Sequence, residues 1–306
     1  MKFTEIKRTE RNQVPPLAPV EGKWSNKALS GIIRCAKVSH LATLVTIAAA
    51  GVCSTFSAHA GLDTFNGLNV NLVGDATIPN SGSNAGNLLL TPSTSGAVGA
   101  AWLTTPVSTT SAFSTTFSFN LANVGGIGNA DGLALVFHNS GTSALGSSGG
   151  FLGIDLPDNT TPGGAVAAVL QTFWNGYGIV QNTDATGGPF THSIPVGAPI
   201  DLSTALLITG TETVAYDPAT QTVSQNMNLG YTDGTSSGSF PLSTSANFDL
   251  GSLFGPTMTM GLSAATGAGT TDQAVTSWTV SGVPEPGSAL FGLALCCVSL
   301  LHRRRG

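Results

Sequence analysis

The chain has 306 residues, only 9% of which are charged, and all 11 lysines and arginines lie before residue 38 or after residue 302. Residues 61–282 contain 11 aspartates, one glutamate (Glu212) and no Lys or Arg, so this stretch carries a formal charge of −12. A surface without cations cannot neutralise phosphates, which excludes nucleic acid as a partner and disfavours docking on anionic lipid.

Residues 1–60 have the pattern of a secretory signal peptide with a long basic n-region. An apolar run over residues 41–52 has signal-peptide length, and Ala58 and Ala60 form a small-x-small cleavage site. The run is too short for a transmembrane anchor. We therefore expect export through the secretion machinery and a mature chain that begins near Gly61.

Residues 61–282 contain short segments rich in Val, Thr, Phe and Leu, separated by clusters of Gly, Asn, Ser, Asp and Pro. Alternation such as that of Phe113, Phe117 and Phe119 with intervening polar residues is typical of half-buried strands. The expected strands are Leu68–Val73, Asn87–Thr91, Ala112–Phe119, Gly132–His138, Ala165–Thr172, Ala205–Thr209, Glu212–Tyr216, Val223–Leu229, Thr257–Leu262 and Ala274–Val280. Helix should be scarce, and the four cysteines all lie outside this stretch. The sequence predicts an all-β antiparallel sandwich or jelly roll that its own core holds together.

Residues 283–306 combine a proline-rich turn, an apolar segment and a terminal arginine cluster. Two prolines fix an extended turn, residues 287–301 predict a short transmembrane helix, and the arginines hold the end on the cytoplasmic side. The motif residues are Pro284, Glu285, Pro286, Arg303, Arg304 and Arg305. This tail resembles the PEP-CTERM sorting signal of Gram-negative bacteria. The resemblance implies an exosortase-type enzyme that removes the tail, and an envelope that produces exopolysaccharide. A simple tail anchor is the alternative.

Eight short motifs follow one another in residues 61–282. They include LLLT at 88–91, FSTTFSF at 113–119, NADGLALV at 129–136, GGFLGI at 149–154, VAAVLQTFWN at 166–175 and GLSAATG at 261–267. In this order they resemble the legume-lectin (L-type lectin) domain along almost its full length. The resemblance implies a concanavalin-like jelly roll that binds sugar.

The resemblance also implies a set of sugar-binding residues. Its carboxylate, main-chain donor, aromatic ring and amide correspond to Asp131, Gly150 or the adjacent Gly149, Phe173 and Asn175. The bond between Ala130 and Asp131 would be a cis peptide, as is frequent in that family. Asp131 could otherwise be a simple turn cap after Asn129.

The metal ligands of the family are mostly replaced. Val169 stands at its glutamate position, Gln171 at its shared aspartate position and Gly178 at the second aspartate position. These replacements should abolish the standard two-metal site. A remodelled single Ca²⁺ site formed by Gln171, Asn175 and Asp184 is the alternative.

The expected function is that of an exported, non-catalytic carbohydrate-binding protein of the bacterial envelope or exopolysaccharide matrix. A structural matrix protein that kept the fold but lost sugar binding is the second hypothesis, and Val169 and Gln171 favour it. A glycoside hydrolase of the same fold is the third. Hydrolases need paired carboxylates, whereas Glu212 is the only glutamate in residues 61–282 and no Glu-x-Asp-x-Glu motif occurs. We therefore expect no enzyme.

Overall fold

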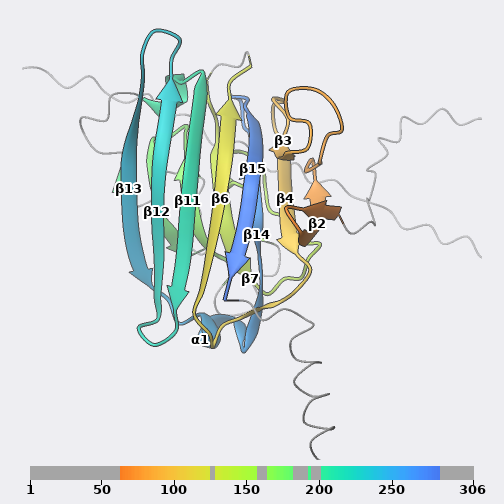
Figure 1. Cartoon of the computed structure of the whole chain (residues 1–306), viewed down its shortest axis with the longest axis vertical. Coiled ribbons are helices and arrows are strands. Elements are labelled where there is room, and N and C mark those ends of the chain that lie inside the picture. Colours follow the sequence, from red (N-terminus) through yellow and green to blue (C-terminus); the bar gives the residue numbers. More distant parts are fainter. Residues whose placement is uncertain (1–62, 125–127, 157–163, 182–191, 194–200, 283–306) are drawn as a thin grey trace, which may run out of the picture. The chain divides into compact units, whose positions relative to one another are not determined.

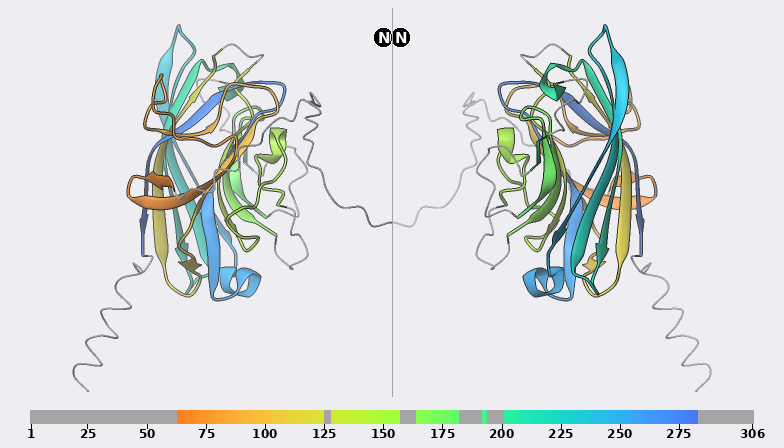
Figure 2. Two further views of the ribbon diagram at one scale, coloured as in Figure 1. Left: turned by 90° about the vertical axis from the view of Figure 1, so that its right-hand side faces the viewer. Right: turned by 90° about the vertical axis from the view of Figure 1, so that its left-hand side faces the viewer.

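The computed structural model describes residues 63–124, 128–156, 164–181, 192–193 and 201–282. These residues form two antiparallel sheets that pack face to face (Figures 1 and 2). The signal-peptide residues, including Ala58 and Ala60, and the sorting tail at 283–306 lie outside the described residues. Within the described ranges, no helix is both long and apolar enough to span a membrane.

The six-stranded sheet carries the most regular alternation in the sequence. In spatial order its strands are β13 (Ser237–Asn247), β12 (Thr222–Thr232), β11 (Leu207–Asp217), β6 (Phe113–Ala122), β15 (Asp272–Ser281) and β3 (Leu88–Thr91). Along β6 every second side chain is buried, because its inner face, which includes Thr115, covers the core, while Ser114, Thr116, Ser118 and Asn120 lie on the outer face. Figure 1 shows these long strands side by side.

The nine-stranded sheet is buried more deeply. Its strands are β1 (Asp63–Phe65), β2 (Leu68–Gly74), β4 (Val98–Leu103), β14 (Thr257–Ala265), β7 (Gly132–His138), β8 (Val166–Gln171), β9 (Gly176–Gln181) and β10 (His192–Ser193), with β5 (Val107–Ser108) paired to β14. Every residue of β7 and β8 is buried. Their unbroken apolar sequences follow from this, since both faces of these strands are covered.

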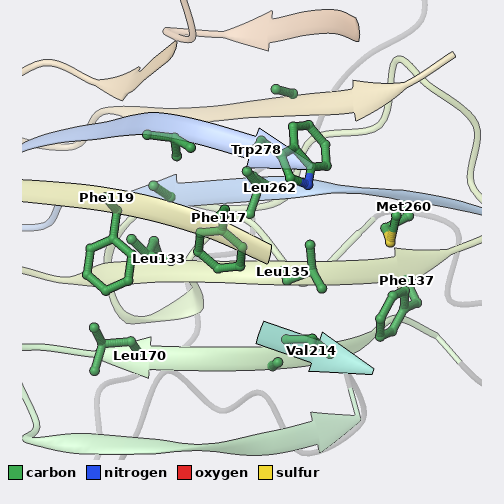
Figure 3. Packing of buried hydrophobic residues seen from close by; sticks show 14 of the residues in the cluster. Phe117, Phe119, Leu133, Leu135, Phe137, Leu170, Val214, Met260, Leu262 and Trp278 are labelled. Carbon is green, nitrogen blue, oxygen red and sulfur yellow. The ribbon is translucent and has the colours of Figure 1, made fainter. Parts of the chain in front are cut away.

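The main core fills the space between the two sheets. Phe117 and Trp278 from one sheet lie close to Leu135 and Leu262 from the other (Figure 3). The indole N–H of Trp278 donates to Thr115 Oγ1 at 2.8 Å, so this large ring is buried without a lost hydrogen bond. Each such side chain contributes about 1.5–3 kcal/mol by leaving water.

A second core covers the outer face of the nine-stranded sheet. Residues 139–156 fold over this face and place Leu152 and Ile154 against Trp102 and Val169. The indole N–H of Trp102 donates to the carbonyl of Ala144 at 2.8 Å, which ties the loop to the sheet. This covering loop holds the short 3₁₀ turn η1 (Gly149–Phe151) in place.

Helix is scarce among the described residues, as predicted. The described residues contain one short α-helix, α1 (Leu250–Phe254), and the 3₁₀ turns η1 and η3 (Leu202–Thr204). The predicted all-β jelly-roll sandwich is confirmed.

Candidate binding site

Four adjacent strands bring the predicted site loops to one end of the nine-stranded sheet. Ala265 of β14 pairs with Gly132 of β7, Gly132 pairs with Gln171 of β8, and Gln171 pairs with Gly176 of β9. The residues that precede β7, follow β8 and follow β14 therefore lie together. Asp131, the turn after Gln171 and the segment after Ala265 meet at this end.

Asp131 is the most constrained residue of this group. The peptide bond between Ala130 and Asp131 is cis, as the sequence resemblance implies. The Asp131 N–H donates to the carbonyl of Ala265 at 2.9 Å, and its carbonyl accepts from the N–H of Thr172 at 2.9 Å. Its side chain is only 6% exposed, and Oδ2 has no hydrogen-bond partner. Burial raises the pKa of this carboxyl to about 6.

Buried amides and hydroxyls surround the cis bond. Thr271 Oγ1 accepts from the Ala130 N–H at 3.0 Å and donates to Asn129 Oδ1 at 3.1 Å. Gln273 Nε2 donates to the carbonyl of Ala265 at 2.6 Å. Because these groups hold the main chain on both sides of the bond, the position of Asp131 is fixed by the fold.

The turn η1 faces Asp131 across Gly267. A Cβ atom at Gly267 would lie 2.8 Å from Asp131 Oδ2 and 3.5 Å from the Cα of Gly149, so only glycine fits between them. The Gly149 N–H donates to the carbonyl of Thr266 at 3.0 Å. That hydrogen bond occupies the Gly149 donor, which leaves Gly150 as the main-chain donor of the predicted pair.

Two aromatic rings project from the turn that follows β8. Phe173 is 43% exposed and Trp174 is 44% exposed, and their rings meet edge to face with centroids 5.1 Å apart. Large exposed rings are unusual unless they contact a partner or a ligand. The sequence prediction included Phe173 but missed Trp174, although two adjacent aromatics in a polar turn are a recognisable signal.

The side chain of Asn175 is bound to η3. Its Nδ2 donates to Asp201 Oδ1 at 2.6 Å, and its Oδ1 accepts from the Leu202 N–H at 2.7 Å. Partial burial acts to raise the pKa of Asp201, but hydrogen bonds from Ser203 and Asn175 outweigh it and lower the value. Asn175 thus anchors the aromatic turn, and its second amide hydrogen and the second lone pair of Oδ1 remain for a ligand. The sequence prediction did not include Asp201, whose cap position before Leu202-Ser203-Thr204 is a visible signal.

The described residues do not fit the two-metal site of the family. Val169 lies fully buried in the second apolar core, and Gln171 directs its amide nitrogen to the Gly150 carbonyl at 3.1 Å. Asn175 is bound to Asp201, and Asp184 lies outside the described residues. No three His, Cys, Asp or Glu side chains among the described residues form a group that could hold a metal ion. The predicted ligand set of Gln171, Asn175 and Asp184 therefore gains no support here.

A jelly roll with these loops at one end of its deeper sheet is the fold of the legume lectins. No protein-family model and no curated protein matches the sequence. Among solved structures, lectin I-B4 of Griffonia simplicifolia in a metal-free form is 22% identical, with a TM-score of 0.53 over 69% of this chain and 92% of that one. The Lotus tetragonolobus seed lectin is 22% identical, with a TM-score of 0.52 over 71% and 94%. A Bauhinia forficata lectin in complex with GalNAc is 23% identical, with a TM-score of 0.51 over 69% and 91%.

Proposed function

We propose that the protein is a non-catalytic, lectin-like protein that binds neutral glycans at the Asp131 end of the nine-stranded sheet. The observation that carries the proposal is the Asp131 carboxylate, whose buried Oδ2 has no partner and faces the η1 turn across Gly267. A sugar supplies hydroxyl donors, and a carboxylate oxygen is the acceptor that two adjacent hydroxyls need.

The neighbouring residues supply the other contacts that a sugar requires. Gly150 offers a main-chain donor, and the exposed face of Phe173 offers a platform for the apolar side of a sugar ring. Because residues 61–282 contain no Lys or Arg, no cation is available to pair with a sulfate or a uronate. Neutral glycans of a cell surface or an exopolysaccharide matrix are therefore the favoured class.

The proposed setting is outside the cell. Residues 1–60 direct export through the secretion machinery, and residues 283–306 hold a precursor in the inner membrane until an exosortase-type enzyme acts on Pro284-Glu285-Pro286. Mass spectrometry of the protein from its native host should find an N-terminus near Gly61 and no residue beyond the tail motif. A protein that retains both ends and stays in the cytoplasmic fraction would contradict this part of the proposal.

A structural matrix protein without sugar binding is the second candidate. Val169 in the apolar core and the amide of Gln171 favour it, because neither side chain is the carboxylate that the family has at that position of its metal site. A glycoside hydrolase receives less support. Glu212 is fully buried between the two sheets, where its carboxyl cannot reach a glycosidic bond.

A glycan array on the full-length protein, with Asp131→Ala as the matched variant, separates these candidates. The proposed function predicts binding to at least one neutral glycan and its loss in Asp131→Ala, while the unfolding temperature stays within a few degrees. If the unaltered protein binds no glycan, either with added Ca²⁺ or in EDTA, the matrix-protein hypothesis replaces the proposed one. Binding that survives Asp131→Ala would place the site elsewhere.

A further inference from the structure

We propose that the Gln171 side chain organises this site directly, so that the η1 turn and Asp131 are held without any metal ion. The proposal rests on the proposed function, because it concerns the same site. It makes Gln171 a positioning residue that acts through Gly150 rather than through contact with a sugar.

Val169 leaves no room for a metal ion beside β8. This residue stands where the sequence resemblance places a metal-binding glutamate, and its side chain packs with Leu152, Ile154 and Trp102. A fully buried isopropyl group offers no lone pair to an ion, and the surrounding cluster supplies only apolar surface. The space that a carboxylate and its ion would need is filled by hydrocarbon.

The Gln171 side chain binds the η1 turn directly. Its Nε2 donates to the Gly150 carbonyl at 3.1 Å, which links the end of β8 to the turn opposite Asp131. The reverse orientation of the amide would place two acceptor oxygens against each other, so this contact fixes the orientation. A carboxylate at residue 171 has no N–H to offer and would repel the Gly150 oxygen. Gln171 therefore stabilises the turn as an amide donor, which an ionised carboxylate cannot replace.

Neutral side chains also hold the main chain on the other side of the site. Gln273 Nε2 binds the Ala265 carbonyl, and Thr172 Oγ1 donates to the Asn129 carbonyl at 3.0 Å. These neutral groups hold the end of β14 and the turn after β8, which lie on either side of the segment that contains the cis bond. The hydrogen bonds named here that position Asp131 and Gly150 all join uncharged groups of the chain itself.

The decisive variant is Gln171→Glu in the full-length protein. It preserves size and burial, so it should fold, and the two accounts predict opposite results for it. If the site were organised by a metal, a carboxylate would strengthen the binding of CaCl₂ or MnCl₂. In the metal-free account, Gln171→Glu removes one hydrogen bond, and exchange of the hydrogen-bonded amides of Gly149 and Leu152 rises about five- to tenfold. Added CaCl₂ or MnCl₂ should not reverse that rise.

Gln225→Met is the matched control. Gln225 is also a buried glutamine whose Nε2 donates to a main-chain carbonyl, that of Val169 at 3.1 Å. Its loss should lower the unfolding temperature but leave exchange of the Gly149 and Leu152 amides unchanged relative to neighbouring strands.

Three further measurements on the unaltered protein need no sugar. Elemental analysis should find no stoichiometric metal, and EDTA should change neither the unfolding temperature nor amide exchange at η1. The inference is overturned if EDTA loosens the turn, if a metal ion co-purifies at one per chain, or if Gln171→Glu leaves the turn unchanged. Absence of glycan binding alongside the expected metal and exchange results would refute the proposed function but leave this inference standing.

Discussion

At the scale of single residues, the chemistry of the site centres on the Asp131 carboxyl. Burial raises its pKa to about 6, so the free protein carries a charged acceptor at neutral pH and a protonated one in mild acid. Only the charged form accepts from two sugar hydroxyls. We expect glycan affinity to be constant above pH 7 and to fall about tenfold per pH unit well below pH 6.

Calorimetric titrations across this pH range test the expectation. Asp131→Asn provides the comparison, because its amide does not titrate and should give weak binding with no pH dependence. If the glycan affinity of the unaltered protein does not change through pH 6, the Asp131 carboxyl does not control sugar binding.

Phe173 and Trp174 give a second prediction at this scale. Both rings are nearly half exposed, so truncating either one removes contact surface while leaving the core intact. We expect Phe173→Ala and Trp174→Ala each to weaken glycan binding by about tenfold, the effect of losing roughly 1–1.5 kcal/mol of ring contact. The unfolding temperatures should stay unchanged. Equal affinity in Trp174→Ala and the unaltered protein would show that only Phe173 contacts the sugar.

At the scale of elements, β11 shows how a glycine can be required inside a strand. The sequence predicts two strands, Ala205–Thr209 and Glu212–Tyr216, whereas β11 runs without a break from Leu207 to Asp217. Gly210 pairs with Phe119 of β6, and a Cβ at Gly210 would lie 2.4 Å from the Phe119 ring. The glycine therefore makes room for a core ring and does not end the strand.

Gly210→Ala tests this reading of β11. The methyl group would overlap the Phe119 ring, and we expect a loss of about 1–3 kcal/mol in the free energy of unfolding. Thr211→Ala, at the exposed neighbouring position, loses only a surface hydrogen bond to Ser118 and should change it by less than about 1 kcal/mol. Urea denaturation of both variants measures the difference, and similar losses in the two would contradict the packing argument.

The strands that sequence reasoning found are those with a strong pattern. The prediction for Gly132–His138 agrees with β7 because an apolar run stands between clear turn residues. The edge strand β13 was missed because it is rich in Ser and Thr, is largely exposed and contains Pro241. Proline is tolerated only because β13 lies at the sheet edge, and position in a sheet is not visible in the sequence.

The site was predictable to the extent that its residues follow ordered motifs. Asp131 and Gly149 could be named in advance, and both lie beside Gly267. The contact between Asn175 and Asp201 could not, because the two are 26 residues apart in sequence and meet only through the folded loops. The second core over β8 could not be predicted either, because nothing in the sequence of residues 139–156 shows which face of a sheet they cover.

At the scale of the whole molecule, the buried pair of Glu212 and Gln225 lies between the two sheets, and Gln225 links them. Glu212 of β11 accepts from Gln225 Nε2 at 2.9 Å, and the same nitrogen donates across the sandwich to the Val169 carbonyl of β8 at 3.1 Å. Burial raises the pKa of Glu212 to about 8, although the hydrogen bond from Gln225 acts in the opposite direction. The carboxyl is therefore protonated in the folded protein at neutral pH.

This buried acid makes stability depend on pH. Between the ordinary pKa of 4.5 and about 8, the folded state holds a proton that the unfolded state has released, so the free energy of unfolding falls as pH rises. This one group contributes a slope of up to about 1.4 kcal/mol per pH unit, which ends above pH 8. Glu212→Gln should remove this slope and be the more stable form at pH 8. Denaturation curves at several pH values measure it, and parallel curves for both proteins would show that Glu212 is not the group responsible.

The claim on which the account depends is that a neutral glycan binds between Asp131, the η1 turn and the aromatic turn after β8. The most direct test is an NMR titration of the full-length protein with the strongest glycan from the array, followed through its backbone amides. The account predicts that the signals of Asp131, Gly150, Phe173 and Trp174 shift together and saturate, both with and without EDTA. Shifts confined to the outer face of the six-stranded sheet, or no saturable shift at all, would contradict it.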